Sequence, residues 1–287
     1  QDSNGLTVED SGLHAIIGGN GVVSSADGGD GGLSGAIKTE GSEEISVREV
    51  QASQIIGGEA GDNGYYGGDV FGLWISGGNT HTIYDLQVHD LSSGHAQYYC
   101  CRGFGFNNFP HTGSPGKAYG IYVQETSSLV LDTVSIQDVI AVQGVSGERA
   151  GGVGSSAWGM WLSDITGLDA KNIKINNVHE GLGGVNEEEN TSAEDGTATC
   201  IHLEEPVEAS FENILCADIG EAVSNGYGFV TGIMPEPTTI RNSIFSEIRG
   251  WCAKSDPDNS PSDLTIAYSV LAGCSSGTLS NVTSGIG

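Results

Sequence analysis

The sequence predicts an all-β chain, folded as a right-handed parallel β-helix (solenoid) with glycine-rich corner loops. Three observations carry the prediction: two phrases of alternating apolar residues recur, the intervals between copies vary, and amphipathic helical periodicity is absent. Alternation marks strands with one buried face. Constant phrases at irregular intervals indicate a fixed coil that carries loops of variable length.

The two phrases alternate along the chain. Copies of the first centre on a glycine and occupy residues 35–37, 71–75, 119–123, 158–162 and 227–230, with a degenerate copy at 199–203. Copies of the second occupy residues 49–55, 85–91, 133–139, 172–178, 213–219 and 242–248, with a looser copy at 265–271. Each pair of phrases is therefore expected to form one coil.

The pattern resembles the parallel β-helix repeats of the pectin-lyase-like superfamily, particularly the NosD-like repeat proteins. The resemblance covers residues 33–272, within a single predicted domain of residues 1–287 whose segments 1–18 and 278–287 are strand-like. It implies the fold and suggests polysaccharide cleavage as an activity. Because this fold hosts many functions, the activity needs its own evidence.

An acidic or amide residue recurs at the next-to-last position of the second phrases and predicts a stripe along the solenoid. Its members are Asp90, Asp138, Asn177, Asp218 and Glu247. We interpret the stripe as a column of turn residues that bond the backbone. A cation site is the alternative, so a divalent cation is left open while no cofactor is predicted.

The charge of the chain excludes several partners. Ten basic and 37 acidic residues give a formal net charge of −27, which repels nucleic acid, anionic membranes and polyanionic sugars. No apolar run reaches the roughly 20 residues that span a bilayer, so no membrane insertion is expected. Because the numbering begins at Gln1 rather than Met, we expect a processed, secreted chain at the cell surface or outside the cell.

Six cysteines without a CxxC pair predict disulfides. Cys252 and Cys274 are 22 residues apart, about one coil, and we predict a bond between them across neighbouring coils. Adjacent Cys100 and Cys101 are expected to have different partners. Asn190 and Asn281 begin glycosylation sequons.

No catalytic or metal-binding motif is found, so no catalytic residue and no metal ligand is predicted, and we expect no lyase or hydrolase activity on polysaccharides, with an enzyme kept as an alternative. The few basic residues are scattered, whereas a uronate lyase needs a base beside cations. The seven histidines lack HExxH and HxH spacings. Paired carboxylates for a glycoside hydrolase stay open because acids are abundant.

One loop, residues 98–111, has unusual content. It combines two cysteines with aromatic and basic side chains, and its candidate binding or interface residues are Tyr98, Tyr99, Arg102, Phe104, Phe106 and Phe109. We weigh a protein interface against a satellite core under the loop, with sugar stacking as a third interpretation.

The functional hypothesis is a secreted structural subunit that self-assembles into a filament, sheath or surface layer. Its motivation is the pair of strand-like termini, because an unpaired strand edge invites another chain. The alternatives are a polysaccharide-degrading enzyme and a glycan-binding adhesin.

Overall fold

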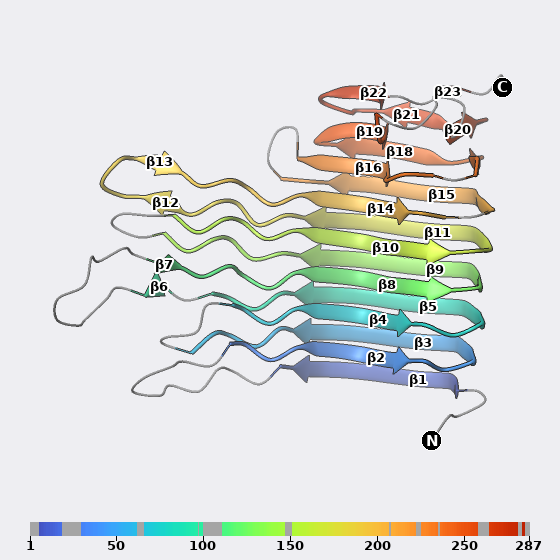
Figure 1. Ribbon diagram of the computed structural model, residues 1–287, viewed down its shortest axis with the longest axis horizontal. Coiled ribbons are helices and arrows are strands. Elements are labelled where there is room, and N and C mark those ends of the chain that lie inside the picture. The colour runs from blue at the N-terminus through green and yellow to red at the C-terminus, as the bar shows by residue number, and fades with distance from the viewer. Residues whose placement is uncertain are drawn as a thin grey trace.

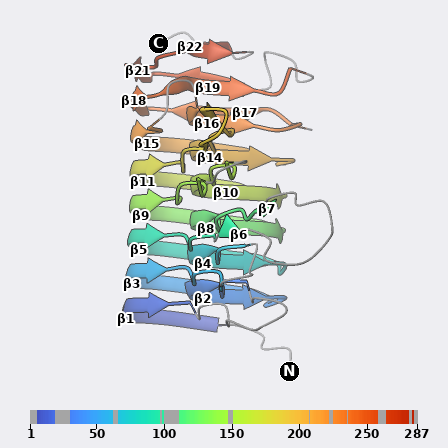
Figure 2. The same cartoon turned by 90° about the vertical axis from the view of Figure 1, so that its left-hand side faces the viewer.

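The computed structural model is a parallel β-helix, as the sequence predicts, and no α-helix occurs among the residues that it describes. It describes residues 6–18, 30–61, 66–96, 98–99, 111–146, 151–206, 208–221, 225–234, 236–257, 264–280 and 283–284. The coils stack in one column from the N-terminal to the C-terminal end and climb with a right-handed sense (Figure 1, Figure 2). Within the described residues no helix is present that could cross a membrane.

Two parallel sheets form the walls of the solenoid. The 11-stranded sheet, sheet A, contains β1 (Leu6–Ile17), β3 (Glu44–Ile56), β5 (Thr80–Ser92), β9 (Ser128–Ile140), β11 (Leu168–His179), β15 (Ala209–Ile219), β17 (Thr238–Arg241), β18 (Ile244–Ile248), β20 (Leu264–Ala267), β21 (Val270–Ala272) and β23 (Thr283–Ser284). The eight-stranded sheet, sheet B, contains β2 (Ser34–Glu40), β4 (Val70–Ser76), β8 (Ala118–Thr126), β10 (Ala157–Ile165), β14 (Ala198–Glu204), β16 (Gly226–Thr231), β19 (Gly250–Ser255) and β22 (Gly277–Ser280).

The predicted phrases are the strands of these sheets. The first phrase forms sheet B and the second forms sheet A, so one coil is one pair of phrases. The loose copy at 265–271 is split between β20 and β21. Alternate side chains of both sheets meet in one core, whose largest fully buried members include Phe211, Phe229 and Phe245.

The acidic stripe is placed differently from the prediction. Its five residues lie inside or at the end of sheet A strands, not in turns, and all have positive φ between 55° and 58°. Asp90 and its equivalents are skipped in the parallel register. Asn and Asp tolerate this left-handed conformation better than most residues, so the column keeps the coils in register where the strands bend.

The glycine-rich connections pack against one another on the side of the solenoid opposite the short turns (Figure 1). Backbone hydrogen bonds of 2.8–3.0 Å, within single connections and between neighbouring ones, link Gly32, Gly58, Gly68, Gly94 and Gly116, a set we call the glycine spine. A Cβ at Gly94 would lie 2.0 Å from the carbonyl oxygen of Gly58. These glycines therefore permit the backbones of the connections to approach closely.

Two short antiparallel hairpins project from the connections. One pairs β6 (Tyr98–Tyr99) with β7 (His111–Thr112), and the other pairs β12 (Val185–Asn186) with β13 (Thr191–Ser192). Both lie on the side where the glycine-rich segments run (Figure 1, Figure 2).

Candidate functional site: an interrupted aromatic face on sheet B

Sheet B presents two columns of aromatic side chains on its outward face. In the three first phrases at 71–75, 119–123 and 158–162, aromatic residues occupy positions one and four, on either side of the glycine and one aliphatic residue. The register aligns Phe71, Tyr119 and Trp158 in a first column and Trp74, Tyr122 and Trp161 in a second column. The two columns pack together as a cluster separate from the main core.

The first column is mostly buried and stabilises neighbouring coils. Phe71, Tyr119 and Trp158 are only 3–7% exposed. Tyr119 and Trp158 stack with centroids 4.8 Å apart and planes 9° from parallel. Burial raises the pKa of Tyr119 well above its ordinary value.

The second column is more accessible and ends in a histidine. Trp74 stacks on Tyr122, and Trp161 stacks on His202, each with centroids 4.0 Å apart. Because the faces of these rings are covered by their neighbours, the stack presents mainly ring edges to solvent. A polar row borders it: Tyr122 Oη donates to Gln124 Oε1 at 2.5 Å, and Gln124 Nε2 donates to Ser76 Oγ at 2.9 Å.

The first column is interrupted at one coil. Thr199 occupies the position between Trp158 and Tyr227, so no ring fills this rung. A recess of about 250 Å³ results, with walls from β10, β14, β16 and β19. Its lining combines aromatic rings, the threonines Thr197 and Thr199, and a lysine at the rim, Lys254.

Two lysines lie over aromatic rings beside this recess. Lys254 Nζ is 5.3 Å from the centroid of the Tyr227 ring, and Lys117 Nζ is 5.8 Å from that of Trp158. Such cation–π contacts hold a flexible side chain against a ring. They also make this rim more positive than the strongly acidic chain as a whole.

Burial shifts the pKa of His202, which lines the recess, and that of its neighbour Glu204. It lowers the pKa of His202 to about 4, although Glu204 Oε2 lies 3.8 Å from His202 Nε2 and favours the charged imidazole. The pKa of Glu204 is raised, chiefly by burial and also by Glu205 and Asp164. His202 is therefore neutral near pH 7 and can both donate and accept a hydrogen bond.

Most of the predicted aromatic loop, residues 98–111, lies outside the described residues. Tyr98 and Tyr99 lie in β6, where their backbones pair with β7, while Arg102, Phe104, Phe106 and Phe109 lie outside the described residues, as do Cys100 and Cys101. The sequence analysis missed the aromatic columns, although their signal is visible: three successive first phrases, at 71–75, 119–123 and 158–162, each contain two aromatic residues three positions apart. In the part of the chain that the structure describes, no group of three or more metal-ligating residues is found.

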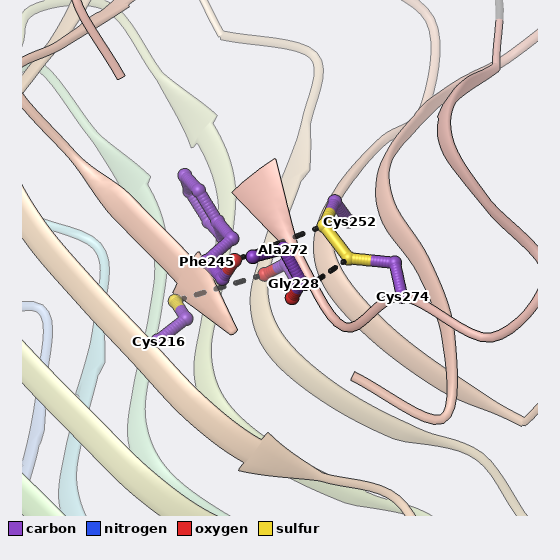
Figure 3. Close-up of a disulfide and its surroundings, with 6 residues drawn as sticks. All are labelled: Cys216, Gly228, Phe245, Cys252, Ala272 and Cys274. Carbon is purple, nitrogen blue, oxygen red and sulfur yellow. Dashed lines mark hydrogen bonds between the residues drawn. A yellow bond between two sulfur atoms is a disulfide. The ribbon is translucent and has the colours of Figure 1, made fainter. Parts of the chain in front are cut away.

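Two disulfides fix the C-terminal coils. Cys252 of β19 bonds to Cys274 with Cα atoms 5.6 Å apart, which joins neighbouring coils as the spacing predicts (Figure 3). Cys200 of β14 bonds to Cys216 of β15 with Cα atoms 6.0 Å apart. Cys200 occupies the position of Gly159, where a Cβ would point at Ile175, so this bond crosses the core between the two sheets.

Comparisons with known proteins give no family. No protein-family model matches the sequence. No curated protein matches it either. The NosD-like resemblance therefore stays a prediction, whereas the parallel β-helix is seen directly in the strand pairing.

Two solved structures show a faint likeness. One is the A-module of the mannuronan C-5 epimerase AlgE4 of Azotobacter vinelandii, with 10% identity, coverage of 99% of this chain and 86% of that chain, and a TM-score of 0.22. The other is the periplasmic alginate epimerase AlgG, with 9% identity, coverage of 88% and 78%, and a TM-score of 0.15. Scores this low bear on neither the fold nor the function of this chain.

Proposed function

We propose that the protein is an extracellular carbohydrate-binding protein whose binding site is the recess at Thr199. The observation that carries the proposal is the interruption of the aromatic column by a threonine, which opens a polar, ring-lined recess in an otherwise packed face. Sugars offer apolar C–H faces to aromatic rings and hydroxyl groups to polar side chains. Tyr227, His202 and the threonines supply both kinds of contact.

The charge of the chain selects among glycans. A net charge of −27 opposes the approach of polyanionic polysaccharides, even though Lys117 and Lys254 make the rim locally positive. We therefore propose a neutral glycan as the ligand. The two disulfides are consistent with an extracellular or periplasmic location, where such glycans are met.

A glycan array probed with the fluorescently labelled intact protein tests the proposal. We expect binding to a subset of neutral glycans, reduced at least roughly tenfold by Tyr227→Ser. The matched control is Tyr84→Ser, which removes a 44% exposed tyrosine from sheet A. Because the aligned position holds a threonine in the preceding coil, a small residue at 227 fits the fold. Absence of binding to every glycan would contradict the proposal.

The proposal includes no chemical step. We expect glycans recovered after incubation with the protein to be unchanged by mass spectrometry. Glu204 is the carboxyl group nearest to His202 among the interactions seen at the recess. Turnover of a bound glycan that Glu204→Gln abolishes would replace binding by a polysaccharide-degrading activity.

A self-assembling structural subunit is a second proposal. It is motivated by β1, which pairs with β3 on one edge while no described strand pairs its other edge. A parallel edge strand can accept a strand from a second copy. Light scattering of the intact protein at high concentration, with and without divalent cations, tests this. A monomer under both conditions argues against assembly.

A further inference from the structure

A second surface with recognition chemistry lies on the outward face of sheet A. A groove of about 590 Å³ crosses β1, β3, β5 and β9 beside the bend at the left-handed column. Isoleucines of three coils, Ile17, Ile56 and Ile140, line it. Ile17 is 66% exposed and Ile56 is 43% exposed, so the groove is open to solvent.

Among the four strands that the groove crosses, β1, β3, β5 and β9, the isoleucines are an exception. They occupy one aligned row with Ser92, while the two outward rows beyond the left-handed column contain no aliphatic residue in the same strands. Those rows hold Gly12, Gln51, Gln87 and Ser135 in one, and His14, Ser53, His89 and Gln137 in the other. Exposed aliphatic surface costs hydration free energy, so a localised row of it on a polar face indicates a surface that a partner covers.

The wall of the groove is acidic. Asp90 and Asp138 line it together with Ala15 and Gln54 of the same left-handed column, and no lysine or arginine among the described residues does. Asp90 accepts a hydrogen bond from His89 at 2.9 Å, and Asp138 accepts one from Asn177. A ligand that complements this groove therefore carries aliphatic groups flanked by positive charge.

We propose that the groove binds a segment of a partner protein in which aliphatic and basic side chains alternate. Strands β3 and β5, in the middle of the groove, already pair on both edges, so a segment that lies over them does not add to the sheet as a strand. It lies across the strands, with aliphatic side chains on the isoleucine row and basic side chains toward Asp90 and Asp138. This site is on the opposite sheet from the recess at Thr199 and is independent of the proposed glycan binding.

Fluorescence anisotropy of short labelled peptides tests the groove in the intact protein. We expect a peptide of alternating isoleucine and lysine to bind, and the isoleucine–glutamate and serine–lysine peptides to bind at least roughly tenfold more weakly. Ile56→Ser and Asp138→Asn should each weaken binding of the first peptide several-fold, and added salt should weaken it further. The matched controls are Ile244→Ser, a 44% exposed isoleucine outside the groove, and Asp218→Asn, from the same left-handed column.

Three outcomes would overturn the inference. One is equal binding of the isoleucine–lysine and isoleucine–glutamate peptides, since the acidic wall would then play no part. Another is binding that Ile56→Ser leaves unchanged. The third is a dimer in sedimentation that Ile56→Ser dissociates, which would make a second copy of this chain the occupant.

Discussion

At the scale of single residues, the positions with left-handed backbone conformation show how polar side chains support a bend within a strand. Asn172 and Asn213 have φ near 55°, and Asn213 Nδ2 donates to Asn172 Oδ1 at 3.1 Å across neighbouring coils. The polar residue that starts each second phrase was visible in the sequence. Its conformation was not, because a turn and a bend within a strand favour the same residue types.

His202 gives a prediction about pH at this scale. Its folded pKa of about 4 lies below the ordinary 6.5, so the unfolded chain takes up the proton first as the pH falls. The contribution of neutral His202 to folding stability is therefore complete above pH 6.5 and is lost progressively as the pH falls to about 4. At about 1.4 kcal/mol for each pH unit, the loss is about 3 kcal/mol.

The comparison with His202→Gln isolates this loss. We expect the wild type to lose about 3 kcal/mol more than the variant between these pH values in urea unfolding experiments. Glu204, whose pKa is raised, titrates in the opposite sense and is present in both proteins. Parallel pH profiles of the two proteins would show that the imidazole is not held neutral by burial.

At the scale of elements, the strands could be predicted from sequence and the glycine spine could not. Alternation in phrases such as 133–139 gives both the strand and its buried face, because one side of each strand must pack in the core. The spine depends on contacts between loops of different length in successive coils. No local pattern encodes which glycine of one loop meets which glycine of the next.

Gly94→Ala tests the spine. The added Cβ would lie 2.0 Å from the carbonyl oxygen of Gly58, so the backbone of a neighbouring coil must move, at a cost of at least about 2 kcal/mol. Gly167→Ala is the control, since its Cβ would be in ordinary contact at 3.5 Å. Thermal unfolding of both variants measures the difference. Equal melting temperatures would contradict close packing of the spine.

The Cys252–Cys274 bond gives a second prediction for an element. Closing its loop of 22 residues stabilises the chain by about 3 kcal/mol in the chain-entropy model. We expect the Cys252→Ser, Cys274→Ser double variant to expose the C-terminal coils first, seen as faster amide exchange in β19 to β22, while β3 to β9 keep their protection. Uniform loss of protection along the chain would indicate that the coils unfold as one unit.

At the scale of the whole molecule, the fold can be predicted because the phrases repeat. The proposed binding site lies where one copy departs from the repeat. The copy at 199–203 looks degenerate in the sequence because Thr199, Cys200 and His202 stand where the preceding copy has an aromatic residue, a glycine and a second aromatic residue. In the structure this same difference is the recess. The residues around the recess could not be predicted from the sequence. Which residues of β10, β14, β16 and β19 lie side by side depends on how many residues each intervening loop contributes to its coil.

Isothermal titration of the intact protein with a glycan from the array, comparing the wild type with Thr199→Phe, tests the central claim most directly. Aromatic residues occupy the aligned position in three preceding coils, so the substitution continues the column and fills the recess. We predict that the variant keeps its melting temperature and loses at least roughly tenfold in affinity. Unchanged affinity in a folded Thr199→Phe variant would show that the glycan does not bind at the recess.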